Sequence, residues 1–282
     1  MMTYNVLCSI CIKEGYDSWP ERLPHLRDVI DRYDPDLLGL QELSSVFSIV
    51  DLMAGDPTYG VVTYAPSLLT FADSTILYRK SRFQLLDSGH FWLGMLPCNT
   101  GAEGWVPSML RYLTWGRFLE RGTHFEFVFI SVHFDANHTN RQQSAHVVTE
   151  WLAPIADTAP IILVGDFNSG PDGIAYATLQ GGNGAPMRFE NVYDYAAARI
   201  VAHNLDGDTD VTGDAGYFRA NGPIDHIFVA GPVAIEAGGW WRDTWVYGPR
   251  KRPPSDHYAI IAELERTLQQ QEGASGGALP QP

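Results

Sequence analysis

The chain has 282 residues, of which 45% are hydrophobic and 18% charged, and its formal net charge is −14. This composition is typical of a folded domain with a sizeable core. Overall charge cannot attract such an acidic chain to nucleic acid, and no apolar run approaches the ~20 residues of a membrane-spanning helix.

Short apolar runs dominate the chain, with a few segments of helical spacing between them. Helices are predicted at 21–33, 44–54 and 141–156, where apolar residues recur every three or four positions. Strands are predicted where β-branched or aromatic residues cluster, at 2–8, 37–40, 59–64, 75–78, 83–86, 113–120, 125–133, 161–164, 224–229 and 257–264. Because the strands come in adjacent groups, we expect two packed sheets with helices outside rather than a doubly wound sheet.

The two ends of the chain differ in character. The start, MMTYNVLCSICIKEGYDSW, has no basic segment, and Lys13 interrupts its apolar stretch. We therefore expect no signal peptide and a cytoplasmic location. We also expect a monomer. The last residues are low in complexity, so we expect residues 1–265 to form a single domain and residues 266–282 a disordered tail.

The chain has three cysteines, Cys8, Cys11 and Cys98. An odd and low count argues against a disulfide framework. Cys8 and Cys11 have the spacing of a metal-binding or redox pair, but no second pair or histidine lies near enough to complete a zinc site. We therefore expect buried or loop thiols.

Polar side chains follow several of the apolar strands. The run 161–164 continues into Gly165-Asp166-Phe167-Asn168-Ser169-Gly170-Pro171. Strand alternation predicts Asp166 and Asn168 on one face and Phe167 on the other, and a strand followed by an Asx-rich turn is the alternative. Asn5 is a polar residue inside the first predicted strand, and similar polar positions at strand ends or edges are Glu42, His133, Asp225-His226 and Asp256-His257. Four of these residues, Glu42, Asp166, Asp225 and Asp256, are carboxylates. Burying carboxylates together without a cation is costly, so the pattern predicts a metal site.

Six segments, MTYNVL, LLGLQE, SVHFD, VGDFNSGPD, GPIDHIFV and PSDHYAI, occur in this order and resemble the endonuclease/exonuclease/phosphatase superfamily. The resemblance runs from about Met2 to about Leu264. It implies an α/β (α+β) fold, a four-layer α-β-β-α sandwich of two mixed β-sheets flanked by helices. It also implies a hydrolase of phosphate esters that depends on Mg²⁺, with Mn²⁺ as the alternative ion.

The resemblance assigns metal ligands and a water-activating group. Glu42 is the main ligand, Asn5 lies beside it, and Asp256 binds the ion through water. Asp166 accepts a proton from the attacking water, and Asn168 orients that water or holds a phosphate oxygen.

Further residues match family positions that contact the phosphate. His257 donates to a non-bridging oxygen, and Asp225 fixes its tautomer and favours its charged form. His133 contacts the phosphate or the leaving group. Arg111 matches an arginine near the phosphate, the alternative being a surface arginine at the start of a strand. Asp73 loosely matches a carboxylate partner of His133.

Two features near the last motif are candidates for substrate contacts. The basic run Arg250-Lys251-Arg252 precedes PSDHYAI, so we expect it to overhang the site. Trp240, Trp241 and Trp245 suit either a stacked base or positions in the core and at a sheet edge, and the second interpretation is preferred.

The sequence departs from two known subgroups. Leu7 stands where apurinic-type nucleases carry an acid, and the segments SGPD and IDHI differ from those of inositol polyphosphate phosphatases. GDFNSGPD followed by Tyr176 is closer to the deadenylase-like and uncharacterised microbial branches.

The favoured activity is a nuclease-like phosphodiesterase, endo- or exonuclease, with single-stranded nucleic acid or a nucleotide as substrate. A phosphomonoesterase or a sphingomyelinase-like lipid phosphodiesterase is the alternative, because a small substrate needs no long basic groove. A catalytically dead binding module is a third hypothesis, and it is disfavoured because no expected metal or base residue is missing.

Overall fold

The computed structural model describes residues 1–65, 72–94, 111–202 and 223–267, and these form thirteen strands and five helices. The strands of the first sheet are β1 (Met2–Asn5), β2 (Leu37–Gln41), β3 (Tyr59–Val62), β4 (Thr75–Arg79), β10 (Arg199–Ala202), β12 (Ile235–Asp243) and β13 (Ile260–Arg266). Those of the second are β5 (Phe83–Leu93), β6 (Arg111–Glu120), β7 (Glu126–His133), β8 (Ile161–Asp166), β9 (Glu190–Asn191) and β11 (Asp225–Ala230). The helices are α1 (Trp19–Tyr33), α2 (Val46–Met53), α3 (His138–Ala156), α4 (Ile174–Leu179) and α5 (Val192–Tyr195).

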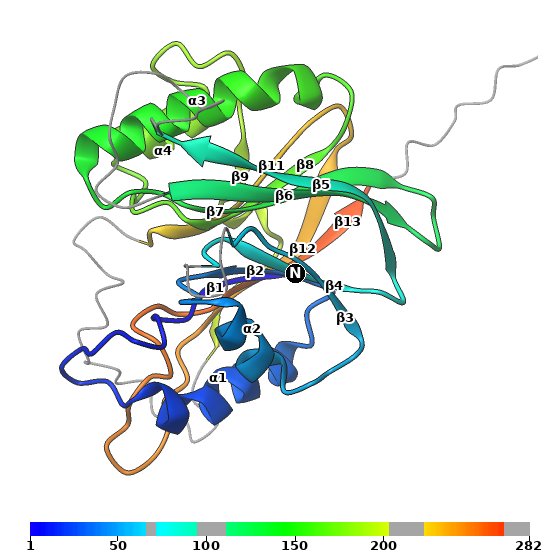
Figure 1. Cartoon of the computed structure of the whole chain (residues 1–282). Helices are drawn as coiled ribbons and strands as arrows, with labels where there is room; N and C mark the ends of the chain where they lie inside the picture. The colour runs from blue at the N-terminus through cyan, green and yellow to red at the C-terminus, as the bar shows by residue number, and fades with distance from the viewer. Residues whose placement is uncertain (66–71, 95–110, 203–222, 268–282) are drawn as a thin grey trace, which may run out of the picture.

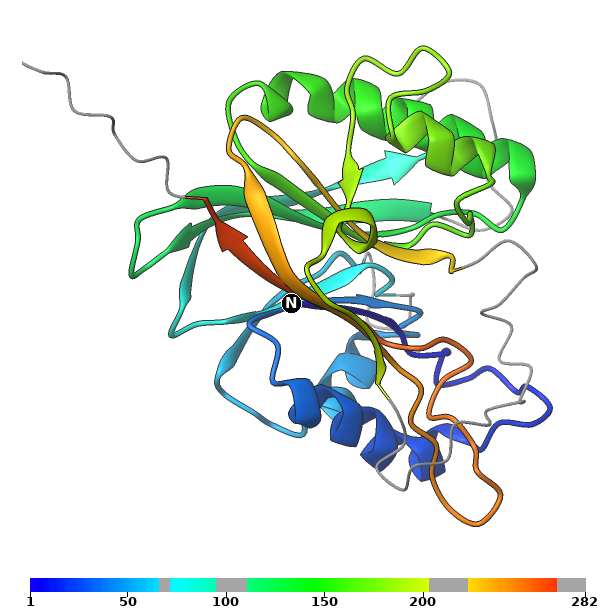
Figure 2. The same cartoon turned by 180° about the vertical axis from the view of Figure 1, so that it is seen from behind.

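The two sheets pack face to face with helices outside, which confirms the four-layer sandwich. Their strand orders are β10-β12-β13-β1-β2-β4-β3 and β5-β6-β7-β8-β11-β9, and both contain parallel and antiparallel pairs. Helices α1 and α2 cover the outer face of the first sheet, and α3 and α4 cover that of the second (Figure 1, Figure 2).

Three apolar layers hold the sandwich together. In β8, Ile162 and Val164 face the layer between the sheets, while Ile161 and Leu163 face the layer beneath α3. This alternation is the expected consequence of a strand that is buried on both faces. A third layer joins α1 and α2 to the first sheet, with Leu26 at its centre.

The topology brings the predicted polar residues to one edge. Strands β1 and β2 are parallel, as are β7 and β8, so the carboxyl ends of each pair lie together. Strand β11 is antiparallel to β8 and places Asp225 opposite Asp166. Strand β13 is antiparallel to β1, so the residues that precede it lie beside the end of β1.

Some elements were not predicted. Strands β9, β10 and β12 and helices α4 and α5 are short or interrupted by glycine, and β12 has a register shift between Ala237 and Gly239. Strand β5 continues to Leu93, past Asp87-Ser88-Gly89, because it pairs with β6 along this length. Antiparallel pairing here outweighs local turn preference.

None of the helices in the described ranges is long and apolar enough to cross a bilayer. The last strand ends at Arg266, and beyond Thr267 the predicted tail lies outside the described residues.

Candidate active site

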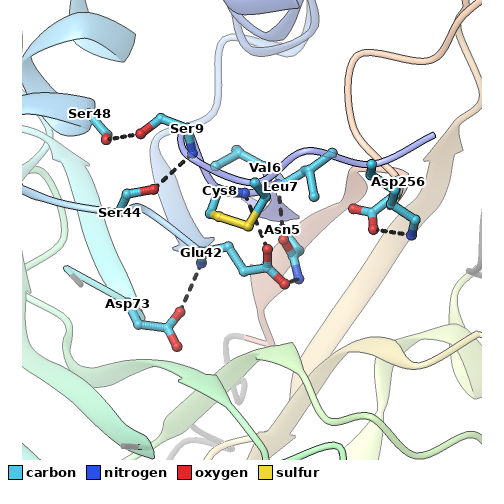
Figure 3. Close-up of a disulfide and its surroundings, with 12 residues drawn as sticks. Asn5, Val6, Leu7, Cys8, Ser9, Glu42, Ser44, Ser48, Asp73 and Asp256 are labelled. Carbon is cyan, nitrogen blue, oxygen red and sulfur yellow. Dashed lines mark hydrogen bonds and ion pairs between the residues drawn. A yellow bond between two sulfur atoms is a disulfide. The ribbon is translucent and has the colours of Figure 1, made fainter. Parts of the chain in front are cut away.

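Asn5, at the end of β1, joins carboxylates from both sheets. Its Nδ2 donates to Glu42 Oε1 at 3.0 Å and to Asp166 Oδ2 at 3.1 Å. Glu42 follows β2, and Figure 3 shows its side chain directed at Asn5. The backbone N–H of Glu42 donates to Asp73 Oδ1 at 2.8 Å. The predicted proximity of Asn5 and Glu42 is confirmed.

Asp166 lies buried between two histidines at the junction of the sheets. Its Oδ2 is 3.4 Å from His133 Nε2 and 3.7 Å from His257 Nε2. Burial alone would raise the pKa of Asp166, but the two histidines, the backbone N–H of Asn168 and the Asn5 amide outweigh it and lower the pKa. Asp166 is therefore an ionised carboxylate in a buried position.

His257 pairs with Asp225, as predicted. Nδ1 of His257 lies 2.8 Å from Asp225 Oδ2, a geometry in which the imidazole N–H donates to the carboxylate. Burial raises the pKa of Asp225 to about 7. Burial opposes the charged form of His257, but Asp225 and Asp166 outweigh it and raise its pKa to about 10. Near neutral pH the proton of this pair therefore resides on His257.

His133 has the predicted carboxylate partner. Its Nδ1 lies 3.2 Å from Asp73 Oδ1 and 2.8 Å from Arg111 Nη1, and Arg111 Nη1 donates to Asp73 Oδ2 at 2.7 Å. Burial and Arg111 lower the pKa of His133, but Asp73 and Asp166 prevail and raise it. Burial would raise the pKa of Asp73, yet His133 and Arg111 lower it strongly. Arg111 is buried in this cluster, so the surface alternative is wrong.

The segment after β8 is an Asx turn rather than a continued strand. The strand ends at Asp166, and the backbone N–H of Asn168 donates to Asp166 Oδ1 at 2.8 Å. Asn168 has φ +49°, and its Nδ2 donates to the carbonyl of Phe134 at 2.9 Å. Asp166 and Asn168 are therefore brought together by a turn. The prediction that they share one face of a continuous strand is wrong. Phe167 points into the apolar layer beneath α3.

Left-handed backbone conformations gather at this edge of the sheets. Leu7, Glu42, Ser74 and Asn168 have φ of +52°, +66°, +61° and +49°. Each either carries a site side chain or lies within two residues of one that does. Such conformations cost energy for non-glycine residues and persist where the surroundings hold them, as is common at active sites.

Lys13 is a site residue that the sequence analysis missed. Its Nζ forms an ion pair with Asp256 Oδ2 at 2.6 Å, and its side chain is 43% exposed. Lys13 lies in the irregular segment between β1 and α1, so no spacing or periodicity marks it. Asp256 itself lies beside Asn5, because Ser255 Oγ donates to the Asn5 carbonyl at 2.7 Å.

The basic run of residues 250–252 is bound to an acidic residue, Asp17. Arg250 Nη2 lies 3.3 Å from Asp17 Oδ1, and Arg252 pairs with the same carboxylate. Two of its three cations therefore already have an acidic partner. Trp240 is buried between the sheets, as the preferred interpretation of the tryptophans predicted, while Trp241 and Trp245 pack beside the layer under α1 and α2.

Cys8 and Cys11 form a disulfide, so the expectation of thiols is wrong for this pair. The N–H of Cys11 donates to the Cys8 carbonyl at 3.1 Å, and the turn brings the two Cα atoms within 5.2 Å, a normal separation for a disulfide. The cysteine count argued against a framework of several bridges, but it does not exclude one local bridge. Cys98 lies outside the described residues.

The donor set fits a divalent cation. Glu42, Asp166, Asp225 and Asp256 bring four carboxylates to one edge, and Asp166, Asp225 and His257 each offer a ligand atom within 4.8 Å of the others. Among the described residues, two buried polar atoms of the site, Asp225 Oδ1 and Arg111 Nε, have no hydrogen-bond partner. A cation and an anionic substrate would satisfy these unpaired groups.

The chain matches the endonuclease/exonuclease/phosphatase family over residues 2–257. It belongs to this family. Enzymes of the endonuclease/exonuclease/phosphatase family hydrolyse phosphate esters and generally depend on a divalent cation, so this chain is a hydrolase acting on phosphate esters.

Solved structures of family members are similar over nearly the whole chain. The mannosyl-6-phosphatase of Bacteroides thetaiotaomicron is 26% identical with a TM-score of 0.77, over 94% of this chain and 98% of that one. An endonuclease/exonuclease/phosphatase protein of Bacteroides vulgatus is 25% identical with a TM-score of 0.77, over 94% and 97% of the two chains. The human nocturnin catalytic domain, with bound sulfate, is 18% identical with a TM-score of 0.68, over 94% and 93%. No curated protein matches the chain.

Proposed function

We propose that the chain is a Mg²⁺-dependent phosphatase that hydrolyses the phosphate monoester of a small molecule such as a phosphorylated sugar. The observation that carries the hydrolytic part is the ionised Asp166 held between His133 and His257 at the junction of the sheets. An anionic base flanked by the protonated His257 and by His133, whose pKa is raised, suits the attack of water on a phosphate.

Glu42 and Asn5 would hold the cation, with Asp256 binding through water. When bound, Mg²⁺ neutralises phosphate charge and stabilises the developing charge on the leaving oxygen. Mn²⁺ is compatible with the same oxygen donors. Lys13 pairs with Asp256, so this carboxylate keeps a cationic partner on its outer side.

Asp166 takes the proton of the attacking water. Its lowered pKa keeps it ionised, and the Asn5 amide and the Asn168 N–H hold its carboxylate in position. The Nδ2 of Asn168 donates to Phe134, which directs its Oδ1 to serve as an acceptor for the same water. His257, charged and oriented by Asp225, donates to a non-bridging phosphoryl oxygen.

His133 and Arg111 supply positive charge on the other side of Asp166. Asp73 binds both of them and fixes their orientation. The Arg111 guanidinium places positive charge near the phosphate, and His133 donates to the phosphate or to the leaving group.

Charge and similarity favour a small substrate. A polynucleotide needs a row of basic groups along its backbone, whereas the chain carries a net charge of −14 and its Arg250 and Arg252 are bound to Asp17. The likeness to a mannosyl-6-phosphatase at 26% identity supports a sugar phosphate. The nuclease-like activity preferred from the sequence stays a prediction.

The experiment compares substrates at equal concentration with Mg²⁺, with Mn²⁺ and with chelator. Release of inorganic phosphate from hexose phosphates is measured beside cleavage of end-labelled single-stranded RNA and DNA and of sphingomyelin. We expect chelator-sensitive phosphate release from a hexose phosphate, and loss of this activity in Glu42→Ala.

A ladder of nucleotides in the same assay, with hexose phosphates untouched, would contradict the proposed substrate and support a nuclease. Lipid turnover alone would point instead to a sphingomyelinase-like enzyme.

A further inference from the structure

A disulfide lies against the proposed metal ligand. Cys8 and Cys11 bond in the segment that follows β1, and the S–S bond stands beside the Glu42 side chain (Figure 3). The backbone N–H of Cys8 donates to Glu42 Oε2 at 3.2 Å, while Oε1 accepts from Asn5. One oxygen of this carboxylate is thus positioned by Cys8 itself and the other by the last residue of β1.

The two cysteines differ in accessibility. Cys8 is 1% exposed, whereas Cys11 lies on the surface. A thiolate from solvent can therefore reach the sulfur of Cys11, and Cys8 is the leaving group. Such an asymmetric pair is suited to exchange with an external dithiol.

The dithiol supplies the electrons and protons that reduction of the disulfide requires. Its first thiolate attacks Cys11 Sγ, the S–S bond breaks, and Cys8 leaves as a thiolate that takes up a proton. The second thiol of the reagent then attacks the mixed disulfide and releases Cys11, which is protonated in turn. The protein gains two electrons and two protons, and the dithiol becomes a cyclic disulfide.

The backbone around Cys8 is held independently of the disulfide. Buried Arg22 donates to the carbonyls of Leu7 and Cys8, the second at 2.9 Å, and the N–H of Ser9 donates to Ser44 Oγ at 2.8 Å. These contacts keep Cys8 in place after reduction, so its sulfur stays beside Glu42.

Sγ of Cys8, Sγ of Cys11 and a carboxylate oxygen of Glu42 all lie within 4.8 Å of one another. Two thiolates and a carboxylate are a donor set for a thiophilic divalent cation, whereas Mg²⁺ prefers oxygen donors alone. Zinc sites with three protein ligands and an open fourth position are common.

We propose that reduction of the Cys8–Cys11 disulfide opens a site for a thiophilic divalent cation such as Zn²⁺, made by Cys8, Cys11 and Glu42. The cation displaces the two thiol protons and binds the thiolates. It also withdraws Glu42 from the catalytic cation, a consequence that rests on the proposed function. Hydrolysis is then inhibited by Zn²⁺ in the reduced protein and insensitive to low Zn²⁺ in the oxidised protein.

The first test is metal binding by the full chain in a Cys98→Ser background, which removes the third thiol. Protein is either oxidised or reduced with dithiothreitol, the reagent is removed under nitrogen, and Zn²⁺ is titrated by calorimetry. Co²⁺ is used in parallel, because thiolate ligands give it a charge-transfer absorption band. The matched control carries Cys8→Ser and Cys11→Ser in addition.

We expect the reduced protein to bind one Zn²⁺ more than the oxidised protein and the double serine variant, whose catalytic carboxylates can also take this ion, and to show the Co²⁺ band that those two proteins lack. Glu42→Gln should keep the band and weaken Zn²⁺ binding. Equal Zn²⁺ binding by the reduced protein and the serine variant would overturn the site. Mass spectrometry after alkylation that finds both thiols free under oxidising conditions would overturn the redox control.

Binding and spectra require no substrate, so their outcome is separate from that of the phosphatase proposal. If no phosphoester is hydrolysed but the reduced protein binds Zn²⁺ as expected, the site stands and the proposed function fails. If a phosphoester is hydrolysed and Zn²⁺ inhibits the serine variant as strongly as the reduced protein, the proposed loss of Glu42 to Zn²⁺ is wrong.

Discussion

At the scale of single residues, Asp166 has the most demanding surroundings in the site. It is buried, it touches a side chain from the opposite sheet, and it faces two histidines. Replacement by asparagine keeps the shape and removes the charge that accepts the proton of water.

We expect Asp166→Asn to lower turnover by about 10²–10⁴-fold, the usual contribution of general acid–base catalysis. Binding of Mg²⁺ should persist, because the cation is assigned to Glu42. Turnover and calorimetric Mg²⁺ binding on the same preparation test this. Activity within a few-fold of the wild type would remove Asp166 from its proposed role.

His226 illustrates a buried histidine that the chemistry does not use. Asn191 Nδ2 lies 3.2 Å from its Nδ1, and its Nε2 donates to the Ser169 carbonyl at 3.0 Å, so the ring is neutral. Burial lowers its pKa to about 4. The adjacent Asp225 pairs with His257 in the site, while the His226 ring packs against Phe167 and Tyr176 of the layer beneath α3.

Stability should therefore depend on pH through His226. As the pH falls below the ordinary histidine pKa, His226 becomes protonated in the unfolded chain. In the folded chain it stays neutral until about pH 4, where its lowered pKa lies. The free energy of unfolding falls across this window, by about 3 kcal/mol for this residue. Urea unfolding of the wild type and His226→Gln at pH 7 and near pH 4 measures the effect. An identical difference between the two proteins at both pH values would contradict a neutral buried ring.

At the scale of elements, the ends of strands determine the site. The sequence was sufficient to predict Glu42, His133 and Asp166 at strand ends, because apolar runs stop there and polar side chains follow. Asn5 was expected inside a strand over residues 2–8, whereas β1 ends at Asn5. The sequence was insufficient for contacts made between segments that no local pattern relates. The ion pair of Lys13 is one such contact, and the Cys8 turn beside Glu42 is another.

Gly165 shows how strictly a strand next to the site is constrained. It has φ +151°, and a Cβ there would collide with the backbone carbonyl of Val132 on β7. We expect Gly165→Ala to lower the free energy of unfolding by about 3 kcal/mol, because both the backbone conformation and the strand spacing must change.

Gly122→Ala is the matched control, since a Cβ at that position meets no atom within 4 Å. Denaturant unfolding of both variants provides the measurement. Equal stabilities of Gly165→Ala and Gly122→Ala would mean that β7 and β8 can move apart to make room for the added Cβ at little cost.

At the scale of the whole molecule, the site joins the two sheets. Asn5 on one sheet donates to Asp166 on the other, and Gln41 Nε2 donates to Ser131 Oγ across the same interface at 3.1 Å. The four-layer architecture was predictable because strand grouping and motif order are carried by the whole chain. The pairing order of the strands was not, because it depends on contacts between distant segments.

Binding of Mg²⁺ at this junction should stabilise the entire fold. A cation that binds only the folded chain adds about 2.7 kcal/mol at a concentration of 100 times its Kd. Differential scanning calorimetry with Mg²⁺ and with chelator should show a higher Tm with the ion, and Glu42→Gln should reduce the gain. A Tm independent of Mg²⁺ in the wild type would argue against the assigned ligands.

The position of β13 bears on when the enzyme becomes active during synthesis. This last strand lies between β12 and β1, and Asp256 and His257 come directly before it. On the ribosome, β1 therefore lacks one of its neighbours until β13 has emerged. A nascent chain still missing this segment has no His257 to pair with Asp225, so hydrolysis begins only once His257 and β13 have been synthesised.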